Sequence, residues 1–232
     1  MKINFLLLAL TIFFCSNLHF SQTAQPETDF QIWNETQLIF PIVKEKDSQG
    51  KQTEKVLFFI TGNLRFGRKL PRLVDERIGF GFDFKVNKYV TLTPSYLYRA
   101  GQPFQGSKEY ENRLRFAVNL EKKWKTFSLR DRNLLEYRLR HSRADSVRYR
   151  NKFQFNYPVI KDKKEMFTPF AANEVFYDFR EKTFTRDEVS LGLSKKLNKN
   201  QTIDFYYLLQ ANKSGALKYL NVFGVNLKIK VD

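Results

Sequence analysis

Residues Tyr110–Tyr157 read YENRLRFAVNLEKKWKTFSLRDRNLLEYRLRHSRADSVRYRNKFQFNY, and apolar and polar side chains alternate there in three consecutive runs. In the first run, Leu114 and Phe116 alternate with Arg113 and Arg115. A period of two places the two sets on opposite faces of a β-sheet. The stretch therefore predicts three amphipathic strands, with one apolar face and one face that carries charges of both signs.

The same alternation extends over the rest of the chain. Short polar turns such as Asn87-Lys88 and Lys213–Gly215 separate the runs. Each run has about 10–16 residues, whereas an ordinary strand has ~5–6, and a bilayer crossing requires strands of ~10 tilted residues. The predicted strands are 30–42, 55–67, 76–86, 89–100, 109–122, 127–141, 147–158, 168–180, 185–196, 202–213 and 217–230.

The composition favours a barrel that faces lipid over the alternative, an exported soluble β-sandwich or lipocalin-like barrel. Aromatic residues make up 16% of the chain, and large side chains dominate the apolar faces. Lysine concentrates in turns, while the charged faces mix Arg with Glu and Asp. We therefore expect an all-β, antiparallel up-and-down transmembrane β-barrel with a charged lumen. Its interfacial aromatic girdles would contain Tyr96, Tyr98, Trp124, Tyr137, Tyr149, Tyr157, Tyr177 and Tyr207.

The eleven predicted strands are an odd number, whereas bacterial single-chain barrels have an even number. The shortest turns follow the third, fifth and ninth predicted strands. If those turns are periplasmic, the last strand ends correctly in the periplasm, and the missing strand belongs near the N-terminus. We expect an extra strand within 23–43 and hence twelve strands. The alternative is a ten-stranded barrel with the first segment outside it.

The first residues have the pattern of a secretion signal. Lys2 precedes the apolar run Phe5–Cys15, whose 11 residues are too few to cross a bilayer as a helix and fit a signal peptide. We expect residues 1–21 to be cleaved and residues 22–232 to form a barrel in the outer membrane of a Gram-negative bacterium. Cys15, the single cysteine, would leave with the signal. The mature chain would then carry 39 basic and 24 acidic residues, a net charge of +15.

Charged residues on the predicted inner faces form the candidate site. A charge in a narrow lumen is costly unless it is paired, and the planar fork of Arg suits carboxylates. Two interpretations stay open. Ion pairs fill the lumen, and the role is structural or rests on binding through the loops. Alternatively, the excess of Arg forms a narrow channel that prefers small anionic solutes. The candidates are Glu35, Arg65, Arg77, Glu111, Arg113, Arg115, Arg130, Arg132, Glu136, Arg138, Arg148, Arg150, Glu174, Arg186 and Glu188.

An outer-membrane lipid-modifying enzyme is the least favoured interpretation. His141 and Ser142 are adjacent, so on a strand they point to opposite faces and cannot act together as base and nucleophile. No zinc spacing, phosphate loop or GxSxG motif occurs, and we expect no cofactor or metal. Nucleic acid is not an expected partner, because basic residues alternate with apolar ones instead of forming a patch. The expected partners are outer-membrane lipids and, for a channel, small anionic solutes.

A series of short motifs resembles a known family. The motifs are Trp33-Asn34-Glu35, Asn63-Leu64-Arg65-Phe66, Glu76-Arg77-Ile78-Gly79, Tyr96-Leu97-Tyr98-Arg99, Glu111-Asn112-Arg113, Arg138-Leu139-Arg140, Tyr149-Arg150, Glu174-Val175-Phe176 and Leu191-Gly192-Leu193. Their order and spacing over about 30–213 resemble the "domain of unknown function 2490" family of predicted outer-membrane β-barrels. The resemblance implies a barrel and an outer-membrane location, and it brings no established activity or catalytic residues.

Overall fold

The computed structural model describes residues 28–46, 50, 52–67, 72–102, 108–213 and 217–231. The expected signal peptide lies outside these residues. Among them, no helix is long and apolar enough to cross a membrane. The described strands are β1 (Thr28–Lys46), β2 (Gln52–Gly67), β3 (Arg72–Lys85), β4 (Val90–Gly101), β5 (Glu109–Lys123), β6 (Ser128–Arg140), β7 (Ser146–Asn156), β8 (Val159–Lys161), β9 (Lys164–Asp178), β10 (Thr183–Lys196), β11 (Gln201–Asn212) and β12 (Tyr219–Lys230).

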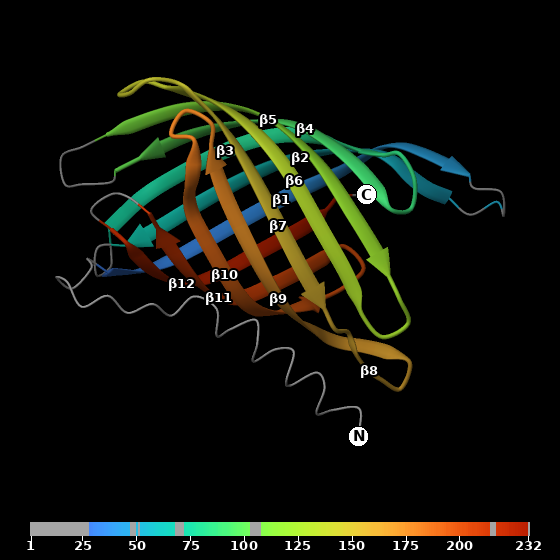
Figure 1. Ribbon diagram of the computed structural model, residues 1–232. Coiled ribbons are helices and arrows are strands. Elements are labelled where there is room, and N and C mark those ends of the chain that lie inside the picture. Colours follow the sequence, from blue (N-terminus) through green and yellow to red (C-terminus); the bar gives the residue numbers. More distant parts are fainter. Residues whose placement is uncertain are drawn as a thin grey trace.

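The strands form one closed barrel (Figure 1). Its wall contains β1 to β7 and β9 to β12, and the sheet closes because β10 pairs with both β9 and β11. Chain neighbours pair antiparallel, as an up-and-down barrel requires. The eleven predicted segments coincide with these eleven wall strands. The prediction of an all-β barrel is confirmed.

The described residues hold twelve strands, as predicted, but the twelfth lies elsewhere. It is β8, a three-residue strand that pairs with the start of β9 outside the closed sheet. Residues 28–46 form one uninterrupted wall strand, so they hold neither an extra strand nor a segment outside the barrel. An odd wall makes the first and last strands run in the same direction. Accordingly β1 and β12 pair parallel, with Ile32 opposite Phe223, and the expected all-antiparallel closure is wrong at this seam.

We refer to the two ends of the barrel as the Thr28 end and the Lys230 end. The Thr28 end holds the start of β1 and the turns 141–145 and 179–182. The Lys230 end holds the end of β12 and the turns 86–89, 124–127 and 197–200. The β1–β2 hairpin and the β8–β9 arm project beyond the wall at the Lys230 end (Figure 1).

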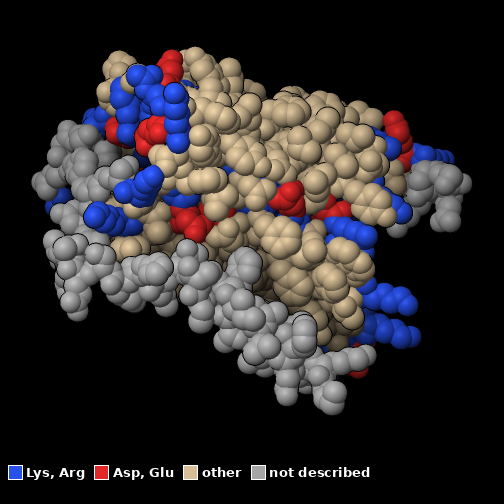
Figure 2. Space-filling view, in the orientation of Figure 1, with Lys and Arg blue, Asp and Glu red and all other residues tan. Residues whose placement is uncertain are grey.

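The outer face of the barrel is apolar. Ile78 is 60% exposed and points outward between the inward-facing Arg77 and Gly79. Leu114 is 55% exposed and points outward between Arg113 and Arg115. Figure 2 shows most charged side chains gathered toward the ends of one face, with a broad and mostly uncharged surface between them. This arrangement inverts a water-soluble barrel, in which large apolar side chains would fill the interior.

A polar patch interrupts that apolar surface on β6, β7, β9 and β10. The carboxylate of Asp131 accepts hydrogen bonds from Asn133 at 2.9 Å and Asn151 at 2.6 Å. Asp187 accepts one from Asn173 at 2.7 Å. All five side chains belong to the outward set of their strands, so we call them the outer polar patch. Acidic side chains are visible within the uncharged surface of this face (Figure 2).

Aromatic rings lie over inward-facing glycines and help to fill the lumen. A Cβ built on Gly224 would overlap the ring of Tyr206 on β11, its neighbour in register. A Cβ on Gly81 would lie 2.7 Å from Cζ of Phe59. Such contacts are closer than real Cβ atoms make, so these positions require glycine while the rings stay in place.

Candidate functional site

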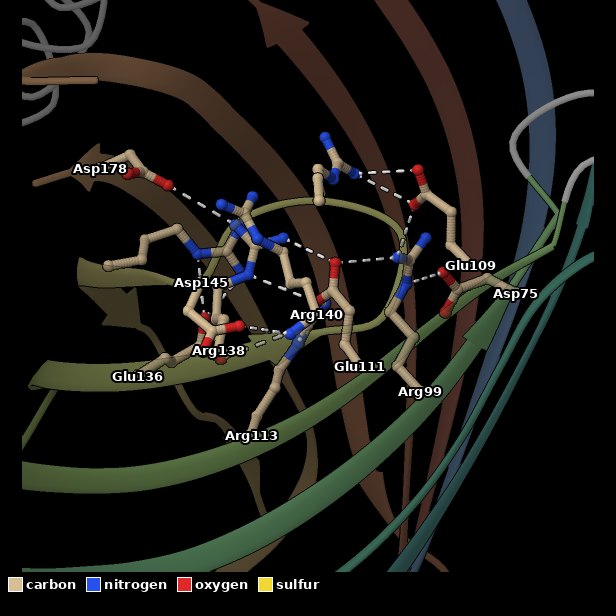
Figure 3. Close-up of polar contacts among 12 residues, drawn as sticks. Asp75, Arg99, Glu109, Glu111, Arg113, Glu136, Arg138, Arg140, Asp145 and Asp178 are labelled. Atoms are coloured by element: carbon tan, nitrogen blue, oxygen red, sulfur yellow. Dashed lines mark hydrogen bonds and ion pairs between the residues drawn. The ribbon is translucent and has the colours of Figure 1, made fainter. Parts of the chain in front are cut away.

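A chain of ion pairs runs along the inner wall near the Thr28 end, starting on β3 and β4. Asp75 contacts Arg77 at 2.5 Å. Asp75 also pairs with Arg99 (Figure 3). Arg99 continues to Glu111 on β5 at 3.3 Å, and to Glu109 at 3.3 Å. The acids and bases therefore form a continuous network rather than isolated pairs.

Glu111 is the first centre of this network (Figure 3). Its oxygens accept hydrogen bonds from Arg113 at 2.6 Å, Arg138 at 2.8 Å and Arg99 at 3.3 Å. Only 1% of the Glu111 surface is exposed. Glu111, Arg99 and Arg138 come from neighbouring strands in register, since Glu111 lies opposite Arg99 on β4 and Arg113 lies opposite Arg138 on β6.

Glu136 on β6 is the second centre and is fully buried. Arg148 donates to its Oε2 from Nη2 at 2.6 Å and from Nε at 2.9 Å. Arg150 donates to Oε1 at 3.2 Å, and Arg113 approaches Oε1 at 4.0 Å. Arg113 therefore links the two centres.

Glu174 on β9 is the third centre. Its Oε1 accepts from Arg150 at 2.7 Å and from Arg132 at 2.8 Å. Asp178, also on β9, pairs with Arg138 at 3.6 Å. The network thus spans β3 to β9, about half of the circumference of the barrel.

Aromatic faces satisfy further guanidinium groups. The ring of Phe176 lies 4.5 Å from Arg150, 5.2 Å from Arg148 and 5.4 Å from Arg186. Arg65 stacks over Trp33 at 3.4 Å. Cations over aromatic rings are stabilised by the ring quadrupole, most strongly where water is excluded. These contacts add to the ion pairs of Arg148, Arg150 and Arg186, and they hold Arg65, for which no ion pair is found among the described residues.

The structure brings some predicted candidates together and leaves others apart. Arg77, Glu111, Arg113, Arg132, Glu136, Arg138, Arg148, Arg150 and Glu174 belong to the network. Arg186 pairs with Glu188 at 3.5 Å on β10, and Glu35 accepts from Asn63 at 2.7 Å. Arg130 pairs with Glu121 at 3.4 Å near the Lys230 end. Among the described residues, no hydrogen bond or ion pair joins Arg115 to a carboxylate.

Four members of the network are absent from the predicted set, namely Asp75, Arg99, Glu109 and Asp178. Asp75 lies one residue before the predicted start of its strand at 76, so the predicted strands do not include it. A register shift between Arg65 and Phe66, opposite Asp75 and Leu73, marks a local irregularity there. Arg99 ends a Tyr-Leu-Tyr-Arg alternation, and this parity could have identified it as inward-facing.

The lumen differs along its length. Toward the Thr28 end the centres Glu111 and Glu136 are almost inaccessible to water. Toward the Lys230 end the inward-facing side chains stay partly accessible, with Arg132 at 33% and Lys228 at 41% exposed. A side chain inside a closed wall can be exposed only to lumen water. The charged side chains of the lumen are therefore buried in its Thr28 half and accessible to water in its Lys230 half, which we call the vestibule.

The structure places the other polar residues considered from the sequence as follows. His141 lies in the turn after β6, with its ring 6.4 Å from that of Tyr110. Ser146 is buried at the start of β7, and its Oγ has no hydrogen-bond partner. In the part of the chain that the structure describes, no group of three or more His, Cys, Asp or Glu side chains could hold a metal ion.

Three solved structures resemble the barrel at low sequence identity. The NanC porin is 11% identical over 82% of this chain and 90% of its own, with a TM-score of 0.47. LpxR from Salmonella typhimurium is 7% identical over 77% and 83%, with a TM-score of 0.44. The siderophore receptor PirA from Pseudomonas aeruginosa is 14% identical over 73% and 35%, with a TM-score of 0.32.

No curated protein shows significant sequence similarity to the chain. A family model, in contrast, matches residues 30–221, which form most of the barrel. The match confirms the resemblance that the ordered motifs indicated. The chain belongs to the family described as "Protein of unknown function (DUF2490)".

Proposed function

We propose that this protein is an outer-membrane β-barrel whose lumen is closed by ion pairs, and that its role is structural or rests on binding rather than on conduction or catalysis. The observation that carries the proposal is the burial of Glu111 and Glu136 among four arginines in the Thr28 half of the lumen. Side chains that fill the lumen at this level leave no continuous aqueous path.

The membrane assignment rests on the outer face. Large apolar side chains project outward from strand after strand, and a water-soluble protein rarely exposes so much apolar surface. Stacked aromatic pairs such as Trp124 with Phe127 and Tyr98 with Tyr110 lie near opposite ends of the wall. This is the placement of interfacial aromatic girdles. The apolar run at the N-terminus supports export to the outer membrane of a Gram-negative bacterium.

A narrow anion-preferring channel is the second candidate. It is favoured by the partly exposed arginine and lysine side chains in the Lys230 half of the lumen. Rings of basic side chains select anions in channels. For this candidate to hold, the ion pairs of the Thr28 half must rearrange and open.

Planar-bilayer recording tests the proposal. The purified protein should give no steps of conductance, because the network blocks the lumen. The double variant Arg113→Ala, Arg138→Ala removes side chains from the block and should produce measurable conductance, while Lys123→Ala at the exposed rim serves as the matched control. Stable conductance by the unaltered protein, with anion selectivity, would support the channel instead. Heat-modifiable migration in detergent tests the barrel, and a melting transition in plain buffer would contradict the membrane assignment.

A further inference from the structure

We propose that the vestibule binds a small oxyanion, a solute that carries a phosphate, sulfate or carboxylate group, between Arg115, Arg132 and Lys152. The site deepens the proposed function, since a barrel that is closed in its Thr28 half and open in its Lys230 half is a cup rather than a pore. The three side chains come from β5, β6 and β7 and face inward.

Arg115 has no carboxylate partner because the carboxylate of the neighbouring Glu136 already accepts hydrogen bonds from other arginines. It lies directly opposite Glu136 in the β5–β6 register. Both oxygens of Glu136 are taken by Arg148, Arg150 and Arg113. The Nε of Arg115 has no hydrogen-bond partner in the described part of the chain. A guanidinium group in a lumen without an acceptor is costly, and an anion would relieve this cost.

Arg132 and Lys152 lie directly opposite each other on β6 and β7. Arg132 uses one Nη to reach Glu174 at 2.8 Å, while its Nε has no partner among the described residues. Lys152 lies opposite Glu174 in the next register pair, yet no ion pair within 4.0 Å joins them in the residues described. Glu174 is shared with Arg150 as well. Glu174 therefore pairs with Arg132 and Arg150, and Lys152 beside them has no carboxylate in contact among the described residues.

Several cations lie close together around the site. Arg115 lies within range of the charges of Arg132 and Arg150 as well as Glu136 and Glu35, and Lys152 lies within range of Arg132 and Arg150 as well as Glu174 and Glu188. Like charges that converge in a region of low dielectric repel strongly. An anion held between them would convert this repulsion into attraction.

Neutral donors and the route of access complete the site. Asn119 lies opposite Arg132 and donates to Thr93 Oγ1 at 3.0 Å, so amide and hydroxyl groups line the same level. Arg132 is accessible to lumen water, and the vestibule beyond it leads past Arg130 and Lys228 to the Lys230 end. A closed wall separates the site from lipid, so the ligand is a soluble anion and not the headgroup of a membrane lipid.

The chemistry of the donors selects oxyanions. The planar fork of Arg matches two oxygens of a phosphate or carboxylate, and a Lys ammonium adds a compact third contact. A cation is disfavoured because the three ligating side chains are themselves cations. A monatomic anion such as chloride is attracted by the positive charge but cannot accept two parallel hydrogen bonds from one guanidinium group, so it should bind more weakly than an oxyanion.

Isothermal titration of the folded protein in a zwitterionic detergent with inorganic phosphate, at constant ionic strength set by chloride, tests the site. We expect saturable binding that weakens at least tenfold in Arg115→Gln and in Lys152→Gln. Arg130→Gln changes a mouth residue that has its own partner, and it should alter the affinity less than twofold. Heat-modifiable migration identifies each variant as folded, and the two site variants are independent of each other.

No saturable binding by the folded protein, or equal affinity in all variants, would overturn the proposal. A short-chain anionic phospholipid added to the titration should leave phosphate binding unchanged, and competition by it would overturn the assignment to a soluble ligand. Conductance is measured in a separate experiment. An open pore would contradict the closed lumen of the proposed function, whereas the titration alone tests the binding site.

Discussion

Glu136 on β6 and Arg148 on β7 face each other in register and join through two hydrogen bonds of 2.6 and 2.9 Å, with no exposure of the carboxylate. Burial of either charge without the other is unfavourable, so each of the two side chains depends on its partner. The same carboxylate also receives Arg150, so it neutralises more than one cation. Glu136 is therefore the residue whose loss should disturb the lumen most.

Glu136→Gln should destabilise the barrel by about 3–5 kcal/mol, the usual cost of leaving a buried charge without its partner. Glu121→Gln is the matched control, because Glu121 pairs with Arg130 at 3.4 Å where both side chains are partly exposed. An exposed pair contributes ~0–1 kcal/mol. Urea unfolding in lipid vesicles, followed by tryptophan fluorescence, measures both. Equal losses of stability in the two variants would contradict the central role of Glu136.

Gly224→Ala should destabilise the barrel by about 1–3 kcal/mol, because the added methyl group displaces the ring of Tyr206 in a filled lumen. Gly62→Ala is the control, since nothing lies within 4 Å of a Cβ at that outward position. There the change should be neutral, or stabilising by up to ~1 kcal/mol. The same unfolding measurement applies. If Gly224→Ala left the stability unchanged, the ring of Tyr206 would not pack against this glycine.

Asp187→Asn should stabilise the barrel in a bilayer by about 1–2 kcal/mol, because it removes a charge from the lipid-facing surface. The hydrogen bond from Asn173 is retained, since the amide oxygen of the new side chain accepts it as the carboxylate does. Asp204→Asn is the control, an inward carboxylate paired with Lys228 at 3.2 Å, and it should give no gain. If Asp187→Asn lost stability, a partner that uses the charge would have to cover the outer polar patch.

Much of the fold follows from alternation alone. Parity assigns Leu114 and Phe116 to the outside and Arg113 and Arg115 to the inside, and the structure confirms each of them. Parity is a local property, so it specifies which face a residue occupies. It does not specify which acid a given arginine reaches across the lumen.

The features that the sequence did not predict depend on contacts distant in the chain or on irregular backbone. Arg138 meets Asp178 only because β6, β7 and β9 are adjacent in the closed wall. Asp75 escaped detection because a register shift lies beside it. The parallel seam between β1 and β12 follows from the odd number of wall strands. The eleven predicted segments matched that number, but the rule that bacterial barrels have an even number of strands led to the expectation of a twelfth.

The parallel seam itself can be tested by a disulfide. Ile32 and Phe223 are register partners on the outer face of β1 and β12. The Cα atoms of register partners on adjacent strands lie within the roughly 4.4–6.8 Å that a disulfide requires. The double variant Ile32→Cys, Phe223→Cys should therefore cross-link under mild oxidation, which is visible as a shift in non-reducing gel migration.

The pair Ile32→Cys, Ile229→Cys serves as the control, because Ile229 lies opposite Leu38 and far along the strand from Ile32. In an antiparallel closure the order of partners would reverse, since each step along β1 would then match a step backward along β12. Cross-linking of the control pair, or of neither pair in the folded protein, would contradict the seam, because only a parallel β1–β12 register places Ile32 beside Phe223 and Leu38 beside Ile229.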